Sequence, residues 1–184
     1  SVSMRETRKF MSIYKFFIED LEKKHRLARS FDAKTEKEKA DSSNKFDYEI
    51  YKSYLSLNEL LIQKYSIAAA IYICYYIRLS NNNDKNEFKI MMENILVIDF
   101  LYYPNQLQDE LIKNIQLEKG IVANDSLRLN LFICFIGIMT RIAVFLIGPP
   151  GCSKTLSFNI LKKEMKGKHS KSKYWQEYPQ LVVI

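Results

Sequence analysis

Eight consecutive residues near the end of the chain could bind a phosphate group. They are Gly148-Pro149-Pro150-Gly151-Cys152-Ser153-Lys154-Thr155. The phosphate-binding loop of many nucleotide-binding proteins follows the pattern G-x-x-x-x-G-K-[ST]. Gly148, Lys154 and Thr155 stand at the spacing that this pattern requires, whereas Ser153 replaces its second glycine. We therefore predict a phosphate-binding loop with one departure from the pattern.

Each part of the loop has a chemical role in this prediction. The first N–H groups of the following helix have no helical partner, and the helix dipole makes that end partly positive, so both favour an anion. Gly151 can adopt a positive φ, and Pro149 and Pro150 stiffen the approach. Lys154 would reach the β- and γ-phosphates, and the Thr155 hydroxyl would be a Mg²⁺ ligand. The alternative is a plain Pro-Gly turn that leaves Lys154 merely exposed.

A strand before the loop and a helix after it should hold it in place. The apolar run 143–147 predicts a β-strand. After the loop, leucine, isoleucine and methionine residues recur at helical spacing up to residue 165. Residues 180–184 predict a second strand. The end of the chain is therefore predicted to have an α/β fold.

The residues before the loop are predicted to be mostly helical. Apolar spacing predicts helices over 1–28, 87–103 and 105–118 and one long or broken helix over 46–79. An apolar helix is predicted over 127–140, with the stretch Asn124-Asp125-Ser126 as its cap. Residues 29–45 alternate in charge, which predicts a solvated connector or loop. We divide the chain into a helical region, 1–103, and a region that carries the loop, 104–184. The predicted fold class is α/β, with a mostly helical N-terminal region followed by the truncated start of a phosphate-loop domain.

Composition limits the classes of function. The net charge of +7 permits binding to nucleic acid, anionic lipid or nucleotide, but lysines and acidic residues are mixed along the chain, so we expect no nucleic acid as partner. The apolar run 65–77 is shorter than the roughly 20 residues of a membrane-spanning helix, so we expect no transmembrane segment. Three cysteines without close spacing fit a reducing compartment, the cytoplasm, better than a zinc site.

A lysine-rich stretch, residues 166–173, follows the predicted loop helix. It is either a solvated connector or a site for phosphate or an acidic partner.

Nucleotide hydrolysis would need residues that the sequence does not offer. An acidic residue at the end of another strand would have to hold Mg²⁺ and orient water, and a cation would have to stabilise the transition state. No apolar run that ends in paired acids follows Thr155. We therefore assign no catalytic residue, and we expect these residues to bind nucleotide without turning it over.

From residue 104 onward the sequence resembles the mysterin family. Residues 105–111, 120–124, 127–132 and 141–157 carry the resemblance. The phosphate loops of that family also have Ser-Lys where Gly-Lys is usual, so Ser153 fits it. Ala143, where the family is expected to have proline, and Thr155, where serine is commoner, depart from it.

The resemblance implies a function. Mysterins are giant AAA+ proteins with tandem ATPase modules and ubiquitin ligase activity. This chain would then be an ATP-binding segment of one AAA+ module, with ATP and Mg²⁺ as cofactors and the neighbouring AAA+ modules of the same polypeptide as partners. Residues 1–103 would include the lid of the preceding module. The predicted nucleotide-binding residues are Gly148, Pro149, Pro150, Gly151, Cys152, Ser153, Lys154, Thr155 and Leu156, with Thr155 also the metal ligand.

Two limits accompany that implication. The zinc-binding residues of a ligase domain have no counterpart in this sequence, so ubiquitin transfer would belong to the parent polypeptide. The alternative function is a helical scaffold segment whose phosphate loop is degenerate and does not support hydrolysis.

Overall fold

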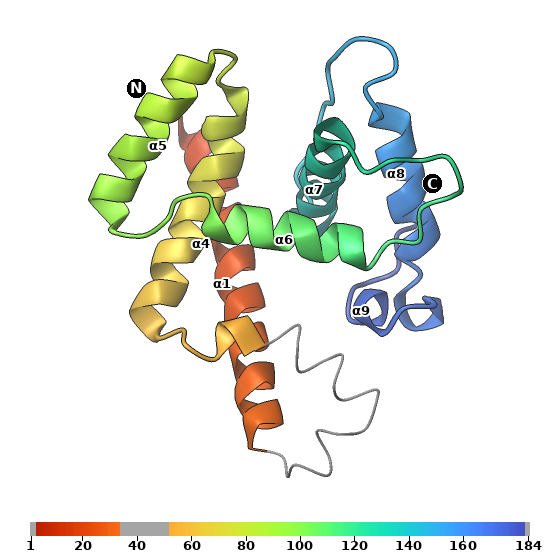
Figure 1. Ribbon diagram of the computed structural model, residues 1–184, viewed down its shortest axis with the longest axis horizontal. Coiled ribbons are helices and arrows are strands. Elements are labelled where there is room, and N and C mark those ends of the chain that lie inside the picture. The colour runs from red at the N-terminus through yellow and green to blue at the C-terminus, as the bar shows by residue number, and fades with distance from the viewer. Residues whose placement is uncertain (1–2, 34–51, 183–184) are drawn as a thin grey trace. The chain divides into compact units, whose positions relative to one another are not determined.

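The structure is a computed structural model that describes residues 3–33 and 52–182 of the 184-residue chain. All regular secondary structure within these ranges is helical (Figure 1). The chain divides into two compact units, Ser1–Leu101 and Tyr102–Ile184. Each unit has its own core and is described separately below.

The N-terminal unit is built on two packed helices. It contains α1 (Met4–Asp32), the 3₁₀ turn η1 (Lys52–Tyr54), α4 (Glu59–Cys74), the 3₁₀ turn η2 (Tyr76–Arg78) and α5 (Asn82–Leu96). A capping box starts α1, in which the Ser3 hydroxyl accepts the Glu6 N–H and the Glu6 carboxylate accepts the Ser3 N–H. Helix α1 packs against α4. Phe17 of α1 and Ala68–Ala70 of α4 are fully buried, and the small alanines allow the two helices to approach closely.

A buried ion pair lies in this unit. Lys24 Nζ is 2.9 Å from Asp20 Oδ2, and both side chains are less than a tenth exposed. The Lys24 ammonium also lies over the Tyr54 ring, 5.3 Å from its centroid. The His25 ring bonds through Nδ1 to the Tyr54 carbonyl oxygen at 2.8 Å. These contacts fasten η1 to α1.

One helical stretch of this unit could cross a membrane by length and composition alone. It is Glu59–Arg78, which comprises α4 and η2, and 33% of its most apolar window is buried. A core helix of a water-soluble protein passes the same test. The packing of α4 against α1 accounts for the apolar residues on its buried side.

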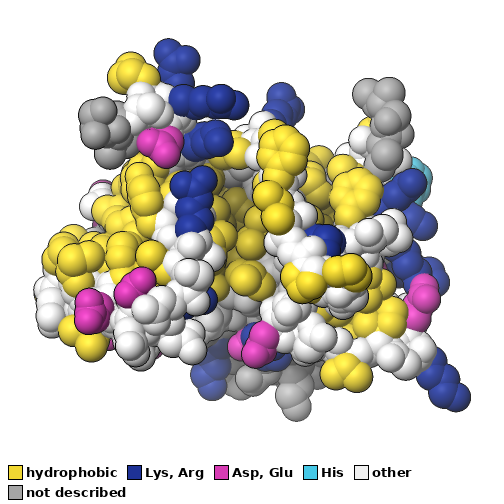
Figure 2. All heavy atoms as spheres, turned by 90° about the horizontal axis from the view of Figure 1, so that it is seen from above, with side chains coloured by type: hydrophobic (Ala, Val, Ile, Leu, Met, Phe, Trp, Pro, Cys, Tyr) yellow, Lys and Arg dark blue, Asp and Glu magenta, His cyan; other side chains and the backbone are white. Residues whose placement is uncertain are grey.

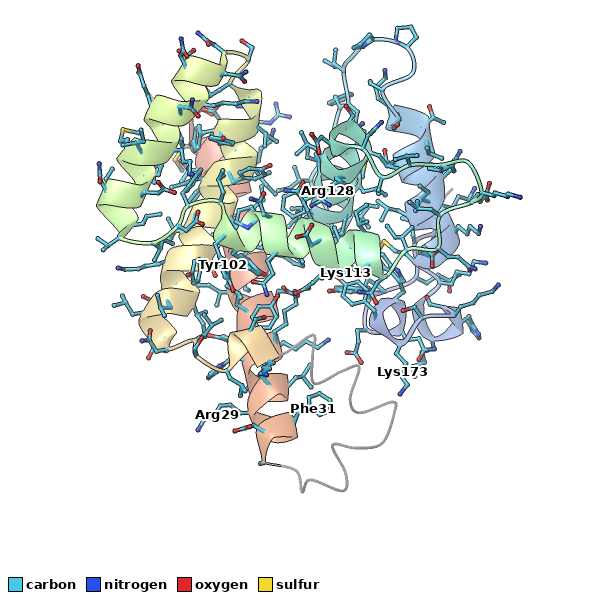
Figure 3. The ribbon with its side chains drawn as sticks, in the orientation of Figure 1. Arg29, Phe31, Tyr102, Lys113, Arg128 and Lys173 are labelled. Carbon is cyan, nitrogen blue, oxygen red and sulfur yellow. The ribbon has the colours of Figure 1, made fainter. Side chains whose placement is uncertain are left out.

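The C-terminal unit surrounds helix α7. It contains α6 (Tyr102–Lys113), α7 (Asp125–Thr140), α8 (Lys154–Glu164), the 3₁₀ turn η3 (Gly167–His169) and the short α9 (Lys173–Gln176). Both α6 and α8 pack against α7. An ion pair between Arg128 on α7 and Asp109 on α6 joins these helices (Figure 3). Trp175 is fully buried against Phe135, and its indole N–H donates to the Asn114 carbonyl at 2.6 Å.

The predicted α/β fold class is wrong for the described residues. Neither 143–147 nor 180–182 forms a strand there, and 183–184 lie outside the described residues. A strand requires a neighbour that accepts and donates its backbone hydrogen bonds. The side chains of Phe145 and Ile147 are 86% and 95% exposed, and no described segment pairs with this run as a strand. An apolar run that favours a strand therefore stays irregular in this structure.

Several predicted helix boundaries are also wrong. The helix predicted over 105–118 ends at Lys113. The predicted helix 87–103 divides, because α5 ends at Leu96 and Val97 adopts a left-handed φ of 55°. Pro104, expected to end a helix, lies in the first turn of α6, where its missing N–H costs no helical bond. The predicted connector 29–45 overlaps the end of α1, and its residues 34–45 lie outside the described residues, as do residues 46–51 of the next predicted helix.

Candidate functional site

The candidate phosphate loop joins two helices of the C-terminal unit. Helix α7 ends at Arg141, whose left-handed φ of 56° turns the chain away. The irregular segment 142–147 and the loop 148–153 follow, and α8 begins at Lys154 (Figure 1). The helix predicted after the loop is confirmed. The loop therefore ends on free N–H groups at a helix N-terminus, as anion binding requires.

Two residues of the loop adopt the left-handed conformation. Gly151 has a φ of 81°, and a Cβ there would meet no atom within 4 Å. Ser153 has a φ of 61°, although it is not glycine. A non-glycine residue in this region is strained by about 1–2 kcal/mol. The position where the usual phosphate-loop pattern has glycine therefore requires a left-handed φ in this loop. Ser153 adopts that φ with backbone strain.

Lys154 points back into the loop. Its Nζ donates to the carbonyl oxygens of Gly148 and Pro149, each at 2.7 Å, and lies 3.2 Å from Cys152 Sγ. The ammonium thus lies within the ring of backbone that a phosphate would enter. A phosphate could bind it only by replacing these carbonyl contacts, and the gain would come from exchanging neutral acceptors for charged ones.

Two side chains that the sequence analysis did not single out hold the loop. Asn130 Nδ2 of α7 donates to the Cys152 carbonyl oxygen at 2.7 Å. The fully buried Ser157 hydroxyl donates to the carbonyls of Ser153 and Lys154 at 2.9 and 2.8 Å. The hint in the sequence was that Asn130 is a polar residue in a mainly apolar helix.

The first turn of α8 borders a small pocket. Thr155, the predicted Mg²⁺ ligand, is exposed there, and the next residue, Leu156, lines a hollow of about 190 Å³. The other lining residues come from α8 and from the segment that follows α6. They are Gln116, Glu118, Ile121, Asn159, Ile160 and Lys163. A hollow of mixed apolar and polar lining thus begins one residue beyond the candidate phosphate loop.

A larger apolar hollow of about 530 Å³ lies between α7, α8 and the segment after α7. Gly137 allows the segment to approach α7, because a Cβ at this position would collide with the Val144 side chain. Burial raises the pKa of the Cys134 thiol, another lining residue, above its ordinary value. Figure 2 looks onto the loop end of this unit and shows hydrophobic side chains at the surface. The apolar residues expected to form a strand are therefore partly uncovered.

The structure brings together most of the predicted site. Lys154 contacts Gly148, Pro149 and Cys152, and Pro150 and Gly151 are exposed beside them. Thr155 and Leu156 lie on the first turn of α8, facing solvent and the small pocket respectively.

Comparison with known proteins links this region to one family. Residues 120–184 match the RNF213 AAA domain family. The chain is 32% identical over 77 residues to the E3 ubiquitin-protein ligase rnf213-beta of Danio rerio, and 26% identical over 126 residues to the E3 ubiquitin-protein ligase RNF213 of Homo sapiens. These alignments cover 42% and 65% of this chain. It is also 42% identical over 53 residues, 29% of its length, to an uncharacterized transmembrane protein of Dictyostelium discoideum. The chain spans only 1–2% of the length of these relatives.

Proposed function

We propose that residues 148–156, which lie within the match to the RNF213 AAA domain family, bind ATP with Mg²⁺. The observation that carries the proposal is the position of Lys154, whose ammonium is held inside the loop at the N-terminus of α8. The ammonium lies in the loop that leads into this helix end, whose first N–H groups have no helical acceptor, and both kinds of donor attract phosphate oxygens.

Three other features support this assignment. Thr155 follows Lys154 directly and is exposed, so its hydroxyl is available to a Mg²⁺ that bridges the phosphates. The hollow next to Leu156 has both apolar and polar lining side chains, so it offers Ile121, Leu156 and Ile160 to the flat face of a nucleotide base. Asn130 holds the Cys152 carbonyl and so helps to preserve the shape of the loop before nucleotide arrives.

The parent polypeptide would be an E3 ubiquitin-protein ligase in the cytoplasm, as the names of two relatives suggest for its activity. In it, this segment would respond to nucleotide and pass the response to neighbouring AAA modules of the same chain. ATP turnover would require acidic and cationic residues from other parts of that polypeptide.

A second function is favoured by the same lysine. Lys154 Nζ already bonds to two loop carbonyls. It could therefore serve only to stabilise the loop, in a scaffold segment that binds no nucleotide. The two functions make opposite predictions for removal of the ammonium. If Lys154 only stabilises the loop, its removal would lower only the free energy of unfolding. If Lys154 binds phosphate, its removal would also lower the affinity for ATP.

The deciding experiment measures ATP·Mg²⁺ binding by isothermal titration calorimetry with the 184-residue chain. Lys154→Ala should weaken binding by about ten- to a hundredfold, because a hydrogen bond to a charged group contributes roughly 1.5–3 kcal/mol. Lys162→Ala, which removes an exposed lysine from the same helix, is the matched control and should leave the affinity unchanged. Equal ATP affinity of the Lys154→Ala variant and the wild type would establish the scaffold function instead.

A further inference from the structure

Most of the net charge of this chain is concentrated in one short stretch of the C-terminal unit. Residues 162–173 contain six lysines and one glutamate, which gives +5 of the chain's total of +7. The lysines and the single histidine of this stretch are all exposed, and we call them the lysine surface: Lys162, Lys163, Lys166, Lys168, His169, Lys171 and Lys173. The glutamate, Glu164, is buried and accepts the Gln116 N–H at 3.3 Å. The exposed charge of this stretch is therefore entirely positive.

The lysine surface spans three elements that hydrogen bonds hold together. The buried Ser170 hydroxyl donates to the Glu164 carbonyl at 2.8 Å and accepts the Lys166 N–H at 3.0 Å, which ties η3 to the end of α8. Gln176 Nε2 donates to the Ser170 carbonyl at 2.9 Å, which adds α9. Gly167 has a φ of 56° at the turn and approaches Gln180 closely, so a Cβ there would lie 3.3 Å from the Gln180 nitrogen.

These hydrogen bonds hold the backbone beneath the exposed charged side chains. Lys173, at the start of α9, is directed away from the unit (Figure 3). Figure 2 shows dark-blue side chains along the outer edge of the unit, with few acidic side chains among them. Binding of a partner here would cost little conformational entropy of the backbone, since hydrogen bonds already hold the loop.

The chemistry of the surface selects among anionic partners. The cations are lysines and contain no arginine, so they provide point charges and no planar fork for bidentate phosphate contacts. The neighbouring aromatic residues Tyr174 and Trp175 are buried, so no ring is available to stack on a base. No exposed apolar side chain accompanies the lysines between residues 162 and 173, although insertion into a lipid bilayer needs one.

A carboxylate already binds part of this surface. Lys163 Nζ pairs with Glu118 Oε1 at 3.1 Å, with both side chains more than half exposed. We infer that the lysine surface is a docking site for an acidic polypeptide segment, one with clustered aspartates or glutamates. The attraction would be electrostatic and therefore weakened by salt. The remaining lysines would bind further carboxylates of the same segment. This inference uses none of the proposed nucleotide ligands, so it stands or falls separately from nucleotide binding.

The test measures binding of the 184-residue chain to a fluorescein-labelled oligoglutamate peptide by fluorescence anisotropy at low and at moderate salt. The triple variant Lys166→Glu, Lys168→Glu, Lys171→Glu should bind at least about tenfold more weakly than wild type, because like charges then face the peptide. The matched control reverses three exposed arginines of the N-terminal unit, Arg5→Glu, Arg8→Glu and Arg26→Glu, for the same change in net charge. It should stay within about twofold of wild type, since these charges lie on a different unit.

Three outcomes would overturn the inference. If both triple variants bound the peptide equally more weakly than wild type, the peptide would be attracted to the net charge of the chain and not to the lysine surface. Tighter binding of an oligouridine RNA of equal charge would assign the surface to nucleic acid, and tighter binding to phosphatidylserine vesicles would assign it to a membrane. A triple Lys→Gln variant at the same three positions separates lost attraction from added repulsion. Circular dichroism spectra and ATP affinity identical to wild type in all variants would show that the fold and the candidate nucleotide loop are intact.

Discussion

Asn130 offers a sharp test of how the tertiary structure supports the candidate loop. Its Nδ2 donates to the Cys152 carbonyl at 2.7 Å, from helix α7 to the middle of the loop. It does not belong to the sequence pattern for phosphate binding. We predict that Asn130→Ala weakens ATP binding although Asn130 itself lies outside the predicted nucleotide ligands.

The size of the effect follows from the bond that is lost. One neutral hydrogen bond contributes about 0.5–1.5 kcal/mol net. Cys152 is only half-buried, so water can replace the lost donor, and the whole unit should keep its fold. If the bond serves mainly to hold the loop in its binding shape, the binding-competent fraction falls by the same free energy, and ATP affinity falls about two- to twelvefold. Asn130→Asp should weaken binding more, because it replaces the donor with a negative charge near the phosphates.

The assay is ATP·Mg²⁺ titration of both variants by calorimetry at fixed salt, alongside urea unfolding followed by circular dichroism. Asn114→Ala is the matched control, since Asn114 Nδ2 makes a comparable bond to the Glu110 carbonyl at 2.9 Å elsewhere in the same unit. It should lower stability by a similar amount and leave ATP affinity unchanged. If Asn130→Ala and Asn114→Ala had the same ATP affinity, the reasoning about the loop would be refuted.

Two further predictions concern the same region. Ser153→Gly should raise the free energy of unfolding by up to about 1 kcal/mol, measured by urea unfolding. Glycine adopts the left-handed φ without strain, and this gain is partly offset because glycine loses more backbone entropy on folding. A lower free energy of unfolding would contradict the strain at Ser153. Burial raises the pKa of the Cys134 thiol, so the unfolded state loses that proton first as the pH rises. The free energy of unfolding should therefore fall above roughly pH 8.5, the ordinary pKa of a cysteine thiol. In a series of thermal melts at rising pH, Cys134→Ala should make that fall shallower. An unchanged slope would show that other groups cause the fall.

The local prediction of the loop succeeded where short-range chemistry decides the structure. The spacing of Gly148, Lys154 and Thr155, with helical periodicity after them, predicted a loop that leads into a helix, and α8 begins at Lys154. The stretch Asn124-Asp125-Ser126 was predicted to cap the apolar helix before the loop, and the Asn124 side chain accepts the Leu127 N–H at the start of α7. Caps and helical periodicity depend on residues within a few positions of one another, so the sequence alone can specify them.

The predicted strands failed for a reason that local sequence cannot contain. Val144, Phe145 and Ile147 have the composition of a strand, yet strand formation depends on hydrogen bonds to a second segment. No described residue supplies that segment, and the run remains irregular with its apolar side chains exposed. Composition therefore indicated a preference that the structure does not fulfil.

By itself, the sequence determined which residues form the candidate loop, that a helix follows it, and that lysines crowd residues 162–173, because these features are encoded in neighbouring residues. Only the tertiary structure showed that Lys154 lies inside the loop, that Asn130 supports it from another helix, and that Ser170 fixes the backbone beneath the lysines. These features join residues between 6 and 22 positions apart, and their distances are set by how the helices of the C-terminal unit pack.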